Sequence, residues 1–233
     1  MTCKKIFAGI ALALGLQTGA SAAIVTLDGD FFDIRFDSAL TGLFGTPTIV
    51  GDAIVWTPSR NTGAYAEAGV ASGSPVDVTS GTFDLKIIAD DGYKITGSSL
   101  TEGGNYYFFG PGTVGLQATG DLWMAGLGPA AGPVSSSLTV STLVSNGSTF
   151  NFATKQWSGS ASVSLGASVD TAHVSIYNLL AAWAIPPDSQ GAYIEKRNVT
   201  LSVGVVPIPE PSTWAMLGLG VGMIGFAIRR KMR

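Results

Sequence analysis

The chain has 233 residues, a formal net charge of −3, one cysteine and one histidine. The single cysteine excludes an internal disulfide framework, and the single histidine excludes a metal site built on a histidine cluster. Residues 23–208 hold fifteen acidic against seven basic residues, a net charge of −8, which argues against binding nucleic acid or anionic polymers through charge.

The N-terminal residues 1–22 predict a secretory signal peptide, which we expect to be a helix in the precursor. Two lysines precede an uncharged apolar run over residues 6–16. This run is too short for a span of ~20 residues and is typical of a signal-peptide core. The small side chains of Ala20 and Ala22 suit signal peptidase, so we expect cleavage after Ala22, with Ala23 as the alternative. Cys3 precedes the apolar run and is removed with it.

Residues 23–205 predict one extracytoplasmic domain that is all-β, a jelly-roll-like β-sandwich. Apolar and polar residues alternate repeatedly. In one example Phe83, Leu85 and Ile87 share one side, while Asp84 and Lys86 share the other. Alternation with a period of two is typical of antiparallel strands that bury one face. We expect roughly ten to twelve strands in two packed sheets.

Glycine-containing dipeptides predict the turns. Asp91-Gly92 and Asn146-Gly147 each separate two apolar runs and suit type I′ hairpin turns, which need positive φ. Gly103-Gly104 is interpreted as a loop before an aromatic strand. Segment 177–184 is either a helix ended by the prolines that follow it or a buried strand.

Four aspartates near the predicted mature N-terminus, Asp28, Asp30, Asp33 and Asp37, are candidate calcium ligands, because calcium prefers oxygen atoms. The complete EF-hand pattern is absent. The alternative is that these aspartates lie at turns and strand ends. His173 alternates with apolar neighbours and is expected to face solvent from a strand.

Aromatic residues of the body are candidates for a sugar-stacking platform, with ordinary core packing as the alternative. They are Trp56, Tyr65, Tyr106, Tyr107, Trp123, Trp157, Trp183 and Tyr193. Glycoside hydrolysis would need two opposed carboxylates, and the sequence does not place such a pair. Ice binding would need a flat array of regularly spaced threonines, and the body has no such array.

The C-terminal residues 206–233 combine a short motif, an apolar run and a basic end. Pro209, Glu210 and Pro211 precede an apolar run over residues 214–228, which we predict to be a single transmembrane helix with Trp214 at its outer edge. At ~1.5 Å per residue the run would be roughly 22 Å long, short for a hydrocarbon core of ~30 Å. The basic residues that follow favour the cytoplasmic side: Arg229, Arg230, Lys231 and Arg233.

In this order, the tripeptide, the short helix and the basic end resemble the PEP-CTERM sorting domain. Some family schemes also label this tail an ice-binding-protein C-terminal domain. The resemblance implies an exported protein of a Gram-negative bacterium, held in the inner membrane until an exosortase reads Pro209, Glu210 and Pro211. The processed protein would then reach the cell surface or the extracellular matrix. The resemblance covers only about residues 206–233 and implies no activity for the body.

The leading hypothesis is a non-enzymatic, structural surface or matrix protein associated with exopolysaccharide or a biofilm. Its processing partners would be signal peptidase and an exosortase, and it would bind no nucleic acid. No cofactor is expected beyond the candidate calcium. The second hypothesis is a glycan-binding module, with or without calcium, whose sign would be two or three exposed aromatic residues lining one groove. The third is a glycoside hydrolase, which requires two carboxylates facing each other across an open cleft.

Overall fold

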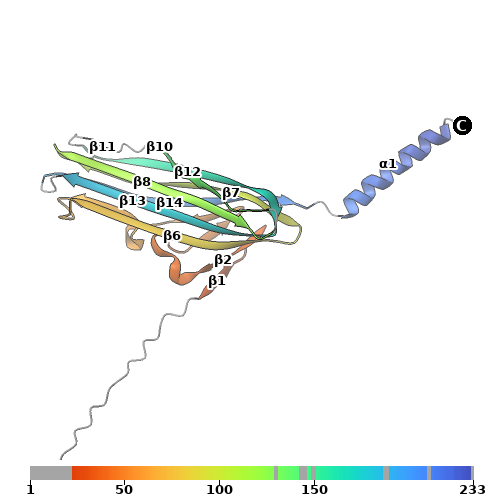
Figure 1. Ribbon diagram of the computed structural model, residues 1–233, viewed down its shortest axis with the longest axis horizontal. Coiled ribbons are helices and arrows are strands. Elements are labelled where there is room, and N and C mark those ends of the chain that lie inside the picture. The colour runs from red at the N-terminus through yellow and green to blue at the C-terminus, as the bar shows by residue number, and fades with distance from the viewer. Residues whose placement is uncertain are drawn as a thin grey trace, which may run out of the picture.

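A computed structural model describes residues 23–128, 131–141, 146–147, 151–185, 189–208 and 211–231. Within these residues, two antiparallel sheets of seven strands each form a two-layer sandwich, and one helix follows them (Figure 1). The predicted two-sheet β fold is confirmed, while the jelly-roll strand order stays a prediction. The predicted signal helix and its cleavage site at Ala20 and Ala22 lie outside the described residues.

The first sheet contains β1 (Ile24–Leu27), β2 (Phe32–Asp37), β6 (Val76–Ala89), β13 (Thr171–Ile185), β8 (Thr113–Gly126), β9 (Val134–Ser137) and β11 (Asn146–Gly147). The second sheet contains β10 (Thr139–Ser141), β12 (Asn151–Val169), β7 (Tyr93–Phe109), β14 (Gly191–Pro207), β4 (Ala53–Trp56), β3 (Thr48–Val50) and β5 (Tyr65–Gly69). Three short 3-10 helices connect strands: η1 (Ser38–Leu40), η2 (Gly42–Phe44) and η3 (Arg60–Thr62).

Six long strands of 14 to 19 residues carry the fold. Strands of about five or six residues are usual, so these strands produce an elongated sandwich (Figure 1). Strand β13 lies between β6 and β8 in the first sheet, and β7 lies between β12 and β14 in the second. Along the chain the six strands alternate between the two sheets, so most pairings join residues that are distant in sequence.

The apolar side chains that alternate with polar ones in the sequence are buried, as predicted. Phe83, Leu85 and Ile87 of β6 are at most 3% exposed and face the other sheet. Transferring such side chains out of water is the main favourable contribution to folding. The core forms two clusters: one around Phe32, Trp56 and Phe83, and a smaller one that contains Tyr106 and Trp157.

Three local predictions are corrected by the pairing. Asp91-Gly92 is a turn, with Gly92 at φ 88, but it connects β6 and β7, which belong to different sheets. Asn146-Gly147 is not a hairpin turn, because it forms β11 and pairs with β8. Gly103-Gly104 is not a loop, because both residues lie inside β7. Segment 177–184, for which a helix and a buried strand were the two alternatives, is a strand, since β13 pairs with β6 on one side and β8 on the other.

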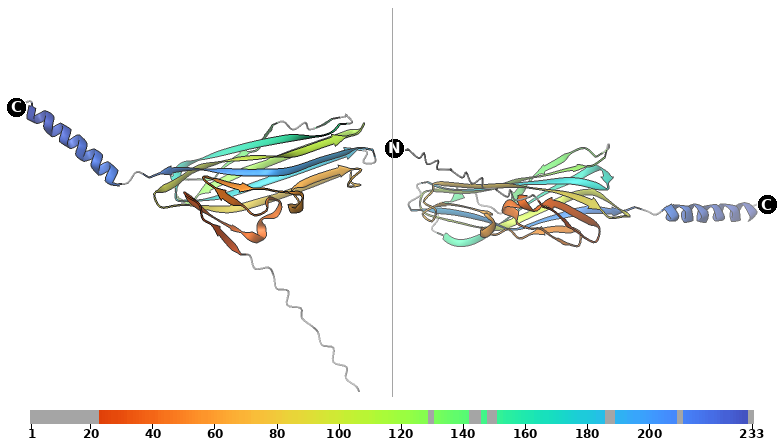
Figure 2. Two further views of the ribbon diagram at one scale, coloured as in Figure 1. Left: turned by 180° about the vertical axis from the view of Figure 1, so that it is seen from behind. Right: turned by 90° about the horizontal axis from the view of Figure 1, so that it is seen from below.

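The helix α1 (Pro211–Lys231) follows β14 and projects away from the end of the sandwich (Figure 2). Its apolar side chains Met216, Leu219 and Met223 are 62% to 70% exposed. Strand β14 remains paired with β7 as far as Pro207, and the backbone N–H of Ile208 donates to the carbonyl oxygen of Gly92 at 2.7 Å. All described strands therefore precede the tail helix.

Candidate functional site

An open groove of about 500 Å³ lies on the outer face of the second sheet. Its floor comes from β7, β12 and β14, and the segment around η3 forms a wall. The lining residues are Ser59, Arg60, Asn61, Asn105, Tyr107, Thr154, Tyr193, Glu195 and Arg197. A volume of this size is in the range of small-ligand sites. The groove is therefore the candidate binding site of the body, and we call it the β14 groove.

Strand β14 presents alternate side chains to this groove. Tyr193, Glu195 and Arg197 face outward, while Ile194 and Lys196 are completely buried. A β-bulge follows at once, because Lys196 pairs with Gly104 and Asn198 with Gly103, so Arg197 is left between the two pairs. Such an extra residue re-aims the side chains after it. It leaves Arg197 and Asn198 exposed and returns Val199 to the core.

The double glycine of β7 makes this bulge sterically possible. A Cβ on Gly104 would lie 1.9 Å from the backbone oxygen of Glu195, and one on Gly103 would lie 3.0 Å from the backbone oxygen of Trp157. The indole nitrogen of Trp157 donates to that same Glu195 oxygen at 3.0 Å. Close backbone approach thus explains the two glycines, and a buried tryptophan fixes the backbone beneath the groove.

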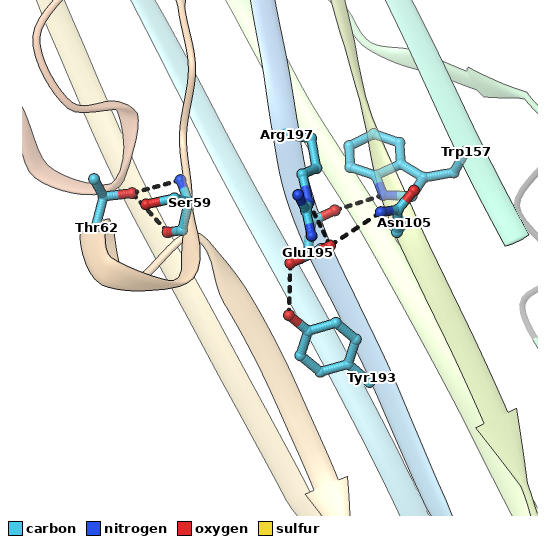
Figure 3. Close-up of polar contacts among 7 residues, drawn as sticks. All are labelled: Ser59, Thr62, Asn105, Trp157, Tyr193, Glu195 and Arg197. Atoms are coloured by element: carbon cyan, nitrogen blue, oxygen red, sulfur yellow. Dashed lines mark hydrogen bonds and ion pairs between the residues drawn. The ribbon is translucent and has the colours of Figure 1, made fainter. Parts of the chain in front are cut away.

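Glu195 is the hydrogen-bonding centre of the groove (Figure 3). Its Oε1 accepts from Asn105 Nδ2 at 3.1 Å and from Arg197 Nε at 2.6 Å, and its Oε2 accepts from the hydroxyl of Tyr193 at 2.7 Å. Burial alone would raise the pKa of Glu195, but these three hydrogen bonds outweigh it and hold the pKa below its ordinary value. Glu195 is therefore an ionised carboxylate at neutral pH, with its lone pairs used to orient neighbouring side chains.

Burial raises the pKa of Tyr193, and the hydrogen bond to Glu195 raises it further. Tyr193 thus stays protonated and remains a donor across the physiological range. Its ring stacks on Tyr107 at 5.1 Å and 21°, and on Tyr65 at 6.1 Å and 29°. The register explains the contact with Tyr107, since Tyr193 lies directly opposite it in the ladder. Such offset aromatic pairs stabilise each other beyond their buried area.

Arg60 lies over two rings of this tyrosine stack. Its guanidinium carbon lies 4.8 Å from the ring centre of Tyr65 and 5.6 Å from that of Tyr193. Its Nη2 also pairs with Glu67 Oε2 at 2.5 Å. The η3 turn that carries Arg60 is fixed by Thr62, whose Oγ1 accepts from the backbone N–H of Ser59 at 3.1 Å (Figure 3). Hydrogen bonds within the η3 turn therefore hold this wall of the groove in place.

The groove combines one carboxylate with a stacked aromatic surface. Among the described residues that line the groove, Glu195 is the single carboxylate, and three donors already occupy it. A pair of carboxylates on opposite sides of a scissile bond would be required for glycoside cleavage. Stacked tyrosines beside amide, hydroxyl and guanidinium groups instead offer one apolar surface and several hydrogen-bonding groups.

The fold places the residues of the predicted aromatic platform in different parts of the molecule. Trp56, Tyr106 and Trp157 are at most 2% exposed and belong to the core. Tyr107 and Tyr193 reach the β14 groove, whereas Trp123 is 39% exposed on the outer face of the other sheet. The solvent-facing position predicted for His173 is confirmed, because that residue is exposed on β13. Sequence reasoning missed Arg60, Asn105, Glu195 and Arg197, although the outward alternation of Tyr193, Glu195 and Arg197 was a usable signal.

The N-terminal aspartates gather near the turn at Asp90. Burial raises the pKa of Asp90, with further contributions from Asp33, Asp91, Asp28 and Asp30. Asp37 instead accepts a hydrogen bond from the backbone N–H of Ala39 at 2.8 Å and caps η1. In the part of the chain that the structure covers, no group of three or more His, Cys, Asp or Glu residues could hold a metal ion. The calcium prediction therefore finds no supporting geometry there.

Asp90→Asn is expected to raise the free energy of unfolding at pH 7 by less than about 0.5 kcal/mol. The raised pKa means that the folded state holds its proton to higher pH than the unfolded state does, so stability falls as pH rises through this titration. The gain from asparagine should therefore disappear below the ordinary pKa of 3.8. Urea unfolding at pH 7 and pH 3 measures both values, and an equal gain at both would contradict the electrostatic cause.

The tail lies apart from the groove and has a separate chemistry. Pro211 is the first residue of α1, which suits proline because its ring presets the helical φ. Arg229 and Arg230 near the other end are exposed. Lys231 ends the helix, and Pro209, Glu210 and Arg233 lie outside the described residues. Trp214 lies in the first turn, in a segment whose side chains the structure does not describe.

Across the described residues, no helix has both the length and the apolar character that crossing a membrane requires. The prediction of a single transmembrane helix over residues 214–228 is corrected accordingly: a helix forms, but a span is not found. The apolar run over residues 214–228 is itself short for a hydrocarbon core of ~30 Å.

Comparison with known protein families finds a match at this end of the chain, where the model of the PEP-CTERM protein-sorting motif covers residues 207–231. The tail carries a PEP-CTERM protein-sorting motif. The PEP-CTERM motif indicates a surface protein targeted to an exosortase, and it implies an exported, membrane-anchored precursor. The match includes Pro209, Glu210 and Pro211 and ends before Arg233. A comparison with curated proteins finds no match.

Proposed function

We propose that the chain is exported, cut by an exosortase near Pro209-Glu210-Pro211, and retained as a structural, non-enzymatic component of the cell surface or of an exopolysaccharide matrix. The single observation that carries this proposal is the PEP-CTERM protein-sorting motif at residues 207–231. Signal peptidase would act first, after Ala22. The precursor of a Gram-negative cell would then wait at the inner membrane, held through its tail, until the exosortase acts.

Two features of the fold support this order of events. Strand β14 and its pairing with β7 end at Pro207, ahead of Pro209-Glu210-Pro211, so a cut at this tripeptide leaves every described strand in place. The described apolar side chains of α1, among them Met216, Leu219 and Met223, are exposed, and the helix projects away from the sandwich (Figure 2). The body is also acidic, which favours solubility once the tail has been removed.

Replacing Pro209, Glu210 and Pro211 together by alanine should block processing in a host with a working exosortase. Full-length precursor should accumulate in the membrane fraction, while wild-type protein at the surface should lack the basic C-terminal peptide. Mass spectrometry of both fractions measures this, with Ser212→Ala as the matched control that processes normally. An intact C-terminus through Arg233 on mature wild-type surface protein would refute the proposal.

A second candidate function is glycan binding, and the β14 groove is the observation that favours it. Tyr107 and Tyr193 supply two aromatic residues at one groove, beside hydrogen-bonding side chains from the η3 segment, β7, β12 and β14. A polysaccharide pull-down with and without a chelator tests this candidate. Binding that survives the chelator is expected, because no described cluster of acids accounts for a calcium dependence.

A further inference from the structure

We propose that the β14 groove selects an uncharged, hydroxyl-rich polysaccharide and rejects acidic polymers. The inference rests on the second candidate function and adds the ligand class. It follows from three properties of the groove: its aromatic floor, its fixed polar groups and the internal neutralisation of its charges.

The floor provides a surface for the apolar face of a sugar ring. Tyr107 is partly exposed and lies within 21° of the plane of Tyr193, which is 7% exposed. Tyr193 in turn stacks on Tyr65, and Arg60 lies over both of these rings, so Tyr107 is supported by neighbouring aromatic rings that are themselves held in place. An aromatic ring held in this way loses little conformational freedom when a ligand packs against it.

Oriented polar groups surround this floor. Glu195 accepts from Asn105 Nδ2, which leaves the amide oxygen of Asn105 to accept from a ligand. Glu195 also accepts from Nε of Arg197, which leaves the guanidinium NH₂ groups to donate. The side chains of Asn61, on η3, and of Thr154, on β12, are exposed at the groove. Pairs of donors and acceptors of this kind match vicinal hydroxyl groups.

The charges of the groove are already paired. Arg60 is bound by Glu67 at 2.5 Å, and Arg197 is bound by Glu195 at 2.6 Å. A carboxylate therefore offsets the charge of each guanidinium, which weakens its attraction for a carboxylate or sulfate on a polymer. The net charge of −8 over residues 23–208 adds a repulsive field against polyanions. An uncharged polymer needs no counter-ion and is not repelled by this field.

Full-length protein in detergent, applied to a microarray of neutral glucans, mannans, galactans and xylans alongside polyuronates and sulfated polymers, tests the inference. Wild type should bind at least one neutral polymer and no acidic one. Tyr107→Ala and Asn105→Ala should each weaken that binding at least tenfold. Trp123→Ala, on the outer face of the other sheet, is the matched control that leaves binding unchanged, and thermal unfolding of each variant checks that the sandwich is intact.

A charge variant gives an independent test of selectivity. Glu67→Gln keeps the shape of the side chain but releases the positive charge of Arg60, so binding to acidic polymers should appear or rise several-fold. Wild-type binding to acidic polymers alone would overturn the selectivity and leave the glycan-binding candidate standing. Binding to no polymer, or binding lost in Trp123→Ala but kept in Tyr107→Ala, would overturn the groove as a glycan site altogether.

Discussion

Glu102→Ala should lower the free energy of unfolding by about 3–5 kcal/mol, because it leaves a buried lysine charge without its partner. Nζ of Lys196 lies 2.5 Å from Oε2 of Glu102, and neither side chain has any exposed surface. Phe44 and Trp157 complete the surroundings, with ring centres 5.6 Å and 6.0 Å from the ammonium nitrogen. Urea unfolding at pH 7 measures the loss.

The pH dependence of this variant identifies the cause. Burial lowers the pKa of Lys196, and the ion pair with Glu102 partly offsets that effect. Without Glu102 the offset is lost, so the folded state releases its proton at lower pH than the unfolded state does. Stability then rises with pH through this window, because the unfolded state binds more protons. The deficit of Glu102→Ala relative to wild type should therefore shrink as pH approaches the ordinary lysine value of about 10.4.

The double variant Lys196→Met with Glu102→Met is the control for this prediction. Replacing both partners by apolar residues of similar volume should recover most of the stability, since the desolvation cost of the pair is removed together with its attraction. Oε1 of Glu102 is buried without a hydrogen-bond partner in the described structure, which adds to the cost of keeping the ion pair. A double variant as unstable as Glu102→Ala would show that packing, rather than charge, causes the loss.

Gly104→Ala is the second substitution with a large expected effect, a loss of at least about 2 kcal/mol. The new Cβ would lie 1.9 Å from the backbone oxygen and 2.8 Å from the backbone carbon of Glu195, and 3.0 Å from Cα of Lys196. These are backbone atoms of the neighbouring strand, so no side-chain rotation relieves the contact. Strand β14 would have to move away from β7, and the bulge that presents Arg197 would move with it.

Thermal and urea unfolding measure the effect, and Gly128→Ala is the matched control. Gly128 has open space around its would-be Cβ, so its substitution should change the free energy of unfolding by less than about 0.5 kcal/mol. The Gly104 variant should also weaken any polysaccharide binding at the β14 groove more than the Gly128 variant does. Equal stability of the two variants would show that the strands accommodate the methyl group without cost.

Local chemistry accounts for much of the fold that sequence reasoning anticipated. Alternation along β6 depends only on the side-chain period of a strand, so Phe83, Leu85 and Ile87 could be placed in the core without knowing their partners. The turn at Gly92 depends on positive φ, which is also local. The partners of these strands are non-local, and the same turn therefore did not reveal that β6 and β7 belong to different sheets.

The residues that form the β14 groove were even harder to predict from the sequence than the strand partners were. Asn105 and Glu195 are ninety residues apart, and they meet because β7 and β14 pair in one register with a bulge. Arg60 and Glu67 join them only through the turn of η3 and the pairing of β5 with β14. A one-residue slip of β14 would send Glu195 into the core and Lys196 into solvent. No local stretch of the sequence determines this register.

By itself, the sequence determined that the chain has β-strand periodicity and a PEP-CTERM tail, because both depend on the order of neighbouring residues. Only the tertiary structure decided that Gly103-Gly104 belongs to a bulge, that Lys196 is buried against Glu102, and that Tyr107, Tyr193 and Glu195 share one groove. The physical reason is that strand pairing joins backbone groups far apart in the chain, and the register of that pairing sets which side chains meet.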